Sequence, residues 1–443
     1  MINVFTPVLT PRIEYAFNLI FHVILKCSVQ FYTLPEDFHK AKGIKINYST
    51  NNGIEGLKLE PYGLLDETHL VAQQIDMTNW DEEKAFFPVN NSFIPFDVFS
   101  AAFYLVSRYE EYLPSKRDSH YRFMSKNSLA GQQHFLELPL VNIWALKLAE
   151  ILQNKYEGTV IAPTKFTYIP TFDIDNAWAF EHKSITRLAL SSIKDFLNRR
   201  WNTLGLRFRV LFKLKRDPYN NYDFMLSTLS QYHFKPITFF LLLNKGKYDR
   251  AVSYRNSHFR SLVLEMASKG EVGVHPSYHS NKKPEHLSNE IEKLYKITNK
   301  KVIRSRQHFL KLSMPKTYRH LIENGIEFDY SMGYPNHPGF RASIASPFYF
   351  FDLLKNETTS LKVYPFQVMD VTLLNYRSMR KEEAVRKITK LMNETAKVGG
   401  TFVSLWHNET LGEFGQSEGW REVYTDMTRL AASIRDGKTT EAL

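Results

Sequence analysis

The chain has 443 residues, of which 43% are hydrophobic and 23% charged, so it can bury sizeable cores and is too long for one ordinary domain. This composition excludes an intrinsically disordered chain. The formal net charge of +11 allows an anionic partner, although a basic face exposed to water is the more common reason for such a charge. No nucleic-acid-binding module is recognisable, so we expect no nucleic-acid partner.

The single cysteine, Cys27, excludes an intramolecular disulfide and a cysteine-based zinc site. A reducing compartment is its simplest explanation. Residues 15–25 form an apolar run, but Asn18 and His22 interrupt it and no small-residue cleavage site follows. The run is too short to span a bilayer and is poor as a signal peptide. We therefore expect an amphipathic core helix there and a cytoplasmic protein, with contact to a membrane surface left open.

Residues 1–160 predict a smaller α+β domain whose role the sequence does not specify. Two short runs are typical of strands and two longer segments have apolar residues at helical spacing. No metal-ligand spacing or phosphate-binding loop occurs among them. Packing, substrate presentation and partner binding all stay open as roles. The expected strands are 43–49 and 57–61, and the expected helices are 97–112 and 140–153.

From residue 161 onward, strand and helix patterns alternate to the end of the chain. Repeating β–α units of this kind are typical of a largely parallel sheet, open or closed into a barrel. The expected strands are 166–172, 236–243, 271–274, 301–305, 326–330, 361–369 and 400–405, and the expected helices are 221–232, 258–269, 285–298, 316–324, 381–397 and 418–436.

One segment, residues 194–215, interrupts this alternation. It carries Arg and Lys side chains interleaved with Phe, Leu and Trp. Such a pattern is typical of a basic amphipathic helix that lies on an anionic membrane. The alternative is a solvated insertion helix that packs through Leu204, Leu206 and Phe208.

Asp173 and Asp175 come at the end of the expected strand 166–172. Strand alternation directs both side chains to the same side, and burying two carboxylates together is costly without a cation. Sites in α/β folds lie at the carboxyl ends of strands, which is where these residues fall. The alternative is a local cap that starts the next helix.

His275 and His279 follow the expected strand 271–274, with Pro276 at what would be the first helical position. Their spacing would put both imidazoles on one helical face, where both could reach one ion. Taken alone, such a pair is as easily explained by surface or core histidines. Together with the two aspartates, an Asp-His-His metal site with a second Asp as base is the better explanation.

Four stretches occur in a characteristic order: Thr-Phe-Asp-x-Asp, His-x-x-x-His, an arginine motif and a late Leu-x-His. In this order they resemble the polysaccharide deacetylase family (NodB homology, carbohydrate esterase 4) over residues 164–440. The resemblance implies an α/β fold, a distorted (β/α)7 barrel, with a divalent metal, Zn²⁺ first, that removes acetyl groups from N-acetylated sugars of a polysaccharide or its precursor. The carbohydrate is the implied partner, and residues 1–160 look like the N-terminal extension of some bacterial members.

The resemblance also implies a role for each matched residue. Asp173 would be the catalytic base and Arg306 the arginine that orients it. His407 would be the general acid, tuned by Asp329. The implied metal ligands are Asp175, His275 and His279.

The sequence departs from the family pattern at three places. Ile174 separates the two aspartates, so base and ligand could be exchanged. His308 stands where the family has a proline and could itself reach the site, and Arg304 competes with Arg306. Two other functions stay open: hydrolysis of another non-peptide C–N bond, and a catalytically silent glycan-binding or assembly protein.

Overall fold

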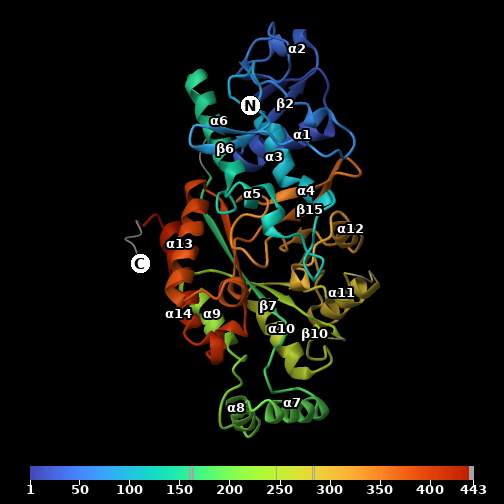
Figure 1. Ribbon diagram of the computed structural model, residues 1–443, viewed down its shortest axis with the longest axis vertical. Coiled ribbons are helices and arrows are strands. Elements are labelled where there is room, and N and C mark those ends of the chain that lie inside the picture. Colours follow the sequence, from blue (N-terminus) through green and yellow to red (C-terminus); the bar gives the residue numbers. More distant parts are fainter. Residues whose placement is uncertain (159–160, 162–163, 246, 282, 284, 439–443) are drawn as a thin grey trace.

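The computed structural model describes residues 1–158, 161, 164–245, 247–281, 283 and 285–438. The elements of the N-terminal part gather at one end of the molecule, and helices α7 (Ile185–Leu197) and α8 (Trp201–Leu211) project at the other (Figure 1). A nine-stranded sheet lies between them. None of the described helices is long and apolar enough to cross a lipid bilayer.

The N-terminal part contains a four-stranded parallel sheet in the order β2-β1-β3-β4 and an antiparallel pair, β5 and β6. The apolar run 15–25 is helical and mostly buried, as α1 followed by a π-helix, Asn18–Ile24. The expected helix 97–112 is divided at Arg108, whose left-handed φ of 56° ends α3 and begins α4. The bounds are β1 Ile2–Phe5, α1 Pro11–Phe17, β2 Val29–Tyr32, α2 Pro35–Lys40, β3 Ile44–Asn47, β4 Leu57–Lys58, β5 Met77–Trp80, β6 Glu83–Phe86, α3 Val98–Val106, α4 Tyr109–Tyr112, α5 Leu129–Gln132 and α6 Leu140–Lys155.

The main sheet has the order β14-β15-β13-β12-β11-β8-β7-β17-β16, and every pairing in it is parallel except that of β14 with β15. The chain is therefore a mixed α/β protein. The strand bounds are β7 Thr167–Ile174, β8 Ile237–Phe240, β11 Glu271–Val274, β12 Arg304–Ser305, β13 Phe328–Asp329, β14 Phe348–Asp352, β15 Glu357–Val363, β16 Val368–Met369 and β17 Thr401–His407; the small pair β9 Asn244–Lys245 and β10 Asp249–Arg250 lies apart from this sheet.

The helices that follow these strands begin and end close to the expected positions. Helix α11, for example, spans Glu285–Thr298 and α13 spans Lys381–Lys397, and both bury one apolar side. The remaining bounds are α9 Tyr222–Gln231, α10 Ser257–Lys269, α12 Lys316–Glu323 and α14 Trp420–Arg435.

The expected barrel is not confirmed. The expected strand 361–369 is two strands: β15 pairs with β13, whereas β16 pairs with β17 at the other end of the sheet order. Only residues 364–367 separate them, and a chain advances at most about 3.5 Å per residue, so the sheet must curl until its two ends are near each other. No ladder between β15 and β16 closes it in the described residues.

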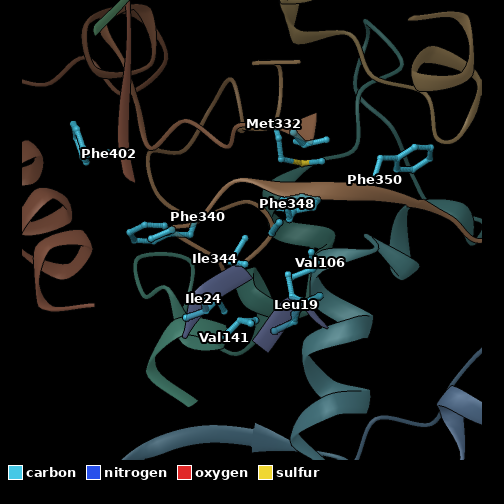
Figure 2. Packing of buried hydrophobic residues seen from close by; sticks show 14 of the residues in the cluster. Leu19, Ile24, Val106, Val141, Met332, Phe340, Ile344, Phe348, Phe350 and Phe402 are labelled. Atoms are coloured by element: carbon cyan, nitrogen blue, oxygen red, sulfur yellow. The ribbon is translucent and has the colours of Figure 1, made fainter. Parts of the chain in front are cut away.

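One hydrophobic core joins the N-terminal part to the main sheet. Figure 2 shows Leu19, Val106 and Val141 beside Ile344 and Phe348, which come from opposite parts of the sequence. The expected boundary at residue 160 lies outside the described residues, and the division into two domains stays a prediction.

A buried ionic cluster, the junction cluster (Arg108, Glu110, Glu111, Tyr334 and Arg341), crosses the same junction. Arg341 donates two hydrogen bonds to the Glu111 carboxylate, at 2.6 and 2.9 Å. Arg108 donates to both glutamates and to the Tyr334 hydroxyl, at 2.7 to 2.9 Å. Each charge in this cluster has a partner of opposite sign.

Candidate functional site

The candidate site lies at the carboxyl ends of neighbouring strands. In the sheet order β12-β11-β8-β7-β17-β16, the residues that end or directly follow these strands carry most of the polar side chains singled out in the sequence. Asp173 and His407 even face each other as register partners on β7 and β17. A cavity of about 490 Å³ opens over them, lined by Asp173, Asp175, His275, His308, His407 and residues of the surrounding loops.

Asp173 forms a buried ion pair with Arg306. Nη1 of Arg306 lies 3.0 Å from Oδ1 of Asp173, and the two residues are 0% and 2% exposed. The guanidinium is held by the Tyr330 carbonyl, at 2.9 Å from Nε, and stacks over the Phe239 ring. Such a charge-assisted contact fixes a carboxylate in one orientation. Arg304, the competing arginine, instead contacts Glu271 at 3.2 Å.

Asp175, His275 and His308 form a cluster whose potential ligand atoms all lie within 4.8 Å of one another. The Nε2 atoms of the two histidines lie 3.2 and 3.3 Å from the two carboxylate oxygens of Asp175. Burial alone would lower the pKa of His308, but the carboxylates of Asp175 and Asp249 outweigh it and raise that pKa to about 9.

The outer contacts of both histidines direct Nε2 towards Asp175. Nδ1 of His275 lies 2.6 Å from the Arg306 carbonyl, which only accepts hydrogen bonds, so this nitrogen carries the proton. Nδ1 of His308 lies 3.0 Å from the Asp249 carboxylate and donates in the same way. In the neutral imidazoles, both Nε2 lone pairs therefore face Asp175, an arrangement common among histidines that bind metals.

These residues fit a divalent cation. Oδ1 of Asp175 is buried and has no hydrogen-bond partner among the described residues, although His275 Nε2 is close. A carboxylate and two imidazole lone pairs that face one another repel unless a positive charge lies between them, either a proton on His308, whose pKa is raised, or a cation that displaces that proton. Two nitrogens and one oxygen are also a common ligand set for catalytic Zn²⁺.

His279 does not join this cluster. The expected helical turn over 275–279 is absent; the backbone N–H groups of Tyr278 and His279 donate to the carboxylate of Asp249 instead. Nδ1 of His279 also contacts Asp249, at 2.9 Å, and its side chain is 36% exposed. Asp249 thus holds His308 with one oxygen and His279 with the other.

His407 is paired with Asp370, not with Asp329. Asp370 accepts from the His407 backbone N–H at 2.7 Å and lies 2.8 Å from Nδ1. Burial lowers the pKa of His407, but the Asp370 carboxylate, with further contributions from Asp175 and Asp173, raises it to about 10. The imidazolium is therefore the stable form at neutral pH, with Nε2 left for the cavity.

Asp329 lies fully buried at the end of β13 and serves the backbone around it. It accepts from the hydroxyls of Ser305 and Ser331, at 2.9 and 2.8 Å, and from the Ser331 N–H. It thereby holds the turn whose Tyr330 carbonyl accepts from Arg306.

The sequence patterns did not predict two carboxylates that lie near the histidines. Asp370 directly follows the expected strand 361–369, so a strand-end signal for it was present in the pattern. Asp249 begins the short strand β10 and carries no motif, so only the tertiary structure reveals it. Glu409, which lines the cavity and accepts from Asn176 at 2.7 Å, is a further case.

The N-terminal part contributes to the wall of the cavity through Arg122. Its guanidinium donates to the Phe309 carbonyl at 2.9 Å and to the Tyr376 hydroxyl at 3.3 Å, and Asp118 holds its Nε at 2.7 Å. Other parts of the wall are aromatic: Tyr219, Tyr376 and Phe414.

The N-terminal part is similar to a family that has no assigned activity. Residues 2–157 match a family described as a family of unknown function, DUF7033. That match covers less than half of the chain. No curated protein sequence matches significantly.

Several solved structures resemble part of the chain. A Mycobacterium smegmatis protein described as a polysaccharide deacetylase is 15% identical with a TM-score of 0.39, covering 64% of this chain and 96% of its own. A polysaccharide deacetylase from Bacillus cereus is 15% identical with a TM-score of 0.30, covering 62% and 91%. A family 4 carbohydrate esterase pseudoenzyme from Bacillus anthracis is 12% identical with a TM-score of 0.28, covering 60% and 62%. Similarity at these scores does not support a function, so any functional proposal must rest on the geometry of the site.

Proposed function

We propose that the protein is a metal-dependent hydrolase that removes acetyl groups from an N-acetylated sugar of a polysaccharide or its precursor. One observation carries the proposal: a three-residue ligand cluster lies beside the Asp173–Arg306 ion pair, with the His407–Asp370 pair on the same cavity. This combination offers a cation site, a fixed base and a protonated acid within one enclosure, which amide hydrolysis requires.

Asp175, His275 and His308 are the residues that would hold the ion, for which Zn²⁺ is the first candidate. A bound Zn²⁺ would polarise the acetyl carbonyl and make a nearby water more acidic. Asp249 fixes the tautomer of His308 and thus keeps its Nε2 available. His279 reaches the same carboxylate from outside and supports it.

Asp173 is the proposed base. Its ion pair with Arg306 holds the carboxylate in place, and its position at the carboxyl end of β7 lets it accept a proton from the attacking water. The arginine also restricts the carboxylate to one orientation, which general-base catalysis needs.

His407 is the proposed acid. Its imidazolium is stabilised by Asp370, so a proton is held at Nε2 until the C–N bond breaks and the departing amine takes it. Asp370 orients the ring through Nδ1 and lets the positive charge persist at neutral pH.

The side chains that line the cavity suit a sugar ligand. Tyr219, Tyr376 and Phe414 provide apolar faces, while Arg122 and Glu409 provide polar groups at the wall. Sugar rings use both kinds of surface, because their C–H faces stack on aromatic rings and their hydroxyls form hydrogen bonds.

Metal-dependent acetate release tests the proposal. The purified full-length chain is stripped with a chelator and titrated with Zn²⁺, and acetate release from N-acetylated chito-oligosaccharides is measured beside a panel of simple amides. We expect one equivalent of tightly bound metal and activity that follows occupancy. Full occupancy with sugar binding but no hydrolysis of any substrate would identify a silent binder instead.

Hydrolysis of the simple amides alone would favour the other C–N hydrolase reading. The cytoplasmic location expected from the single cysteine stays a prediction.

A further inference from the structure

A pair of helices is inserted in the chain between β7 and α9. We call residues 185–216 the α7–α8 hairpin; they include the turn between the two helices and the tail that follows α8. In Figure 1 the hairpin projects from the end of the molecule opposite the N-terminal elements. Its base is anchored firmly, because the Asp217 carboxylate accepts hydrogen bonds from the backbone N–H groups of Ala179, Phe180 and Glu181, at 2.8 to 3.0 Å. These hydrogen bonds fix the base of the hairpin to the rest of the structure.

The inner face of the hairpin combines an ion pair with a small apolar cluster of Phe180, Leu206 and Val210. Asp195 on α7 and Arg207 on α8 form a salt bridge of 2.5 Å, and Arg207 also donates to the Ser192 hydroxyl at 2.6 Å. Both charged residues are almost fully buried, and the Arg207 guanidinium stacks over Phe180. A charged pair thus takes part of the position that a soluble helical pair normally gives to its apolar core.

The outer face of the hairpin is apolar. Ten of the 23 large hydrophobic side chains that are exposed in the described part of the chain lie between residues 185 and 214. On α7 they follow helical spacing and form one stripe, and on α8 a second stripe begins at Trp201, whose ring meets Phe196 at 5.2 Å. The ten residues are Ile185, Leu190, Ile193, Phe196, Leu197, Trp201, Phe208, Leu211, Phe212 and Leu214.

Basic side chains accompany these apolar stripes. Residues 185–216 contain nine Lys and Arg against the single carboxylate of Asp195, a formal charge of +8 out of the chain's +11. Arg199, Arg200 and Arg209 are exposed, as are Lys213 and Lys215. One short segment therefore carries most of the protein's excess charge and its densest exposed apolar surface.

We propose that the α7–α8 hairpin is a peripheral docking surface for an anionic lipid bilayer. Aromatic and aliphatic side chains enter the boundary between headgroups and acyl chains, while Lys and Arg contact anionic headgroups. Contact of this apolar face with water is unfavourable, and contiguous exposed apolar patches on proteins mark interaction surfaces.

The charge of the hairpin selects the bilayer over a second copy of this chain. Two copies that met through this face would bring segments of +8 together, and like charges at close range repel. An anionic bilayer instead supplies opposite charge and an apolar interior in the same layer. It therefore satisfies both properties of the surface at once.

Docking would also bring the cavity towards the membrane. Asp175 follows β7 directly and α7 begins ten residues later, at Ile185, so the hairpin leaves the sheet at the edge that carries the candidate site. The docking proposal does not depend on the proposed hydrolysis, because the surface exists whatever the cavity does.

Vesicle sedimentation with the full-length chain tests the proposal. Vesicles of phosphatidylcholine alone are compared with vesicles that contain phosphatidylglycerol, at about 0.05 M and about 0.5 M salt. We expect at least tenfold tighter binding to the anionic vesicles and a loss of most of that difference at high salt. A second readout is a blue shift of tryptophan emission that disappears in Trp201→Phe.

Two double variants separate the apolar and the electrostatic parts. Phe196→Ser with Trp201→Ser should abolish binding, whereas Leu354→Ser, at another exposed apolar residue, should leave it unchanged. Arg199→Glu with Arg200→Glu should weaken binding more than tenfold, because each basic residue near an anionic surface is worth about fivefold. Lys269→Glu with Lys300→Glu is the matched charge control and should change binding little.

Three results would overturn the proposal. They are equal binding to neutral and anionic vesicles, no binding to anionic vesicles at low salt by the correctly folded protein, and self-association through the hairpin without vesicle binding. Thermal melting and size-exclusion chromatography check that each variant is folded, and because all substituted residues are exposed, we expect the melting temperature to change little.

Discussion

Two of the buried clusters of charged side chains in the described residues differ in what surrounds them. The junction cluster of Arg108, Glu110, Glu111 and Arg341 is closed, and its carboxylates are each bonded to an arginine. The site cluster of Asp175, His275 and His308 opens on a cavity and leaves a buried carboxylate oxygen without a hydrogen bond. Burial of charge is common to both; only the second has acceptors in excess and room for a ligand.

This difference separates a structural network from a reactive site. Glu111 has a pKa lowered to about 2: burial raises it, but Arg341 and Arg108 outweigh burial. The charges of the junction cluster therefore pair with one another, and these pairs hold two parts of the chain together. In the site, carboxylates and imidazoles face a common empty volume, so they can act on something that enters it.

The largest expected effect is the loss of metal in His308→Ala. Because His308 presents Nε2 to Asp175, its removal should leave no stoichiometric Zn²⁺ and reduce hydrolysis to background, as measured by elemental analysis and acetate release. His279→Ala is the matched control, since both histidines contact Asp249. It should keep one equivalent of metal, with affinity weakened by no more than about 10–100-fold, the usual cost of losing an outer-shell partner. The reverse result would make His279 the ligand.

Asp173→Asn should come next. The substitution keeps the size of the side chain but removes the base, so the rate should fall by about 10²–10⁴ while bound metal stays at one equivalent. Elemental analysis and kcat, measured on the same preparation, check both parts. If Asp173→Asn lost the metal while Asp175→Asn retained it, the roles of the two aspartates would be exchanged.

A smaller effect concerns the alkaline limb of the pH profile. His407 acts as an acid only while protonated, and Asp370 raises its pKa towards 10, so activity should persist above neutral pH and decline as the ring loses its proton. Asp370→Asn removes the carboxylate, and the alkaline limb of kcat should move to lower pH by about one unit or more. Asp329→Asn is the control: it does not touch His407 and should leave the limb in place, whatever it does to stability.

The smallest effect on the site should come from the junction cluster. Glu111→Gln leaves Arg108 and Arg341 without their shared carboxylate and should lower the free energy of unfolding by about 3–5 kcal/mol, with metal content unchanged. Glu137→Gln, in a more exposed pair with Lys387, should cost no more than about 1 kcal/mol. Denaturant titration measures both, and loss of metal in Glu111→Gln would contradict the separation of the two clusters.

The same glutamate predicts a pH dependence of stability. Its folded-state pKa, about 2, lies below its ordinary value of 4.5, so ionised Glu111 stabilises the fold above pH 4.5. This contribution should be lost as the pH falls from 4.5 towards 2, and Glu111→Gln should lose less stability than the wild type across that window. Equal acid sensitivity of the two proteins would contradict the pairing.

Local pattern alone identified much of what later forms the site. Asp173, Asp175 and His275 could be found because they follow apolar strands, and a strand's alternation and length are properties of a few neighbouring residues. The apolar spacing likewise predicted both ends of the helix 381–397. The basic and apolar pattern of 194–215 also stood in the sequence, but not its division into two helices with the Asp195–Arg207 pair between them.

Partners distant in sequence were decided by the tertiary structure. Which histidine completes the cluster depended on the turn at 275–279, where Asp249 captures two backbone N–H groups and directs His279 outward. The pairing of His407 with Asp370 depended on β16 crossing to β17, away from β15. Sequence determines which residues end a strand because strand formation is local; which strand ends meet depends on how the whole sheet curls, and that is set by long-range packing.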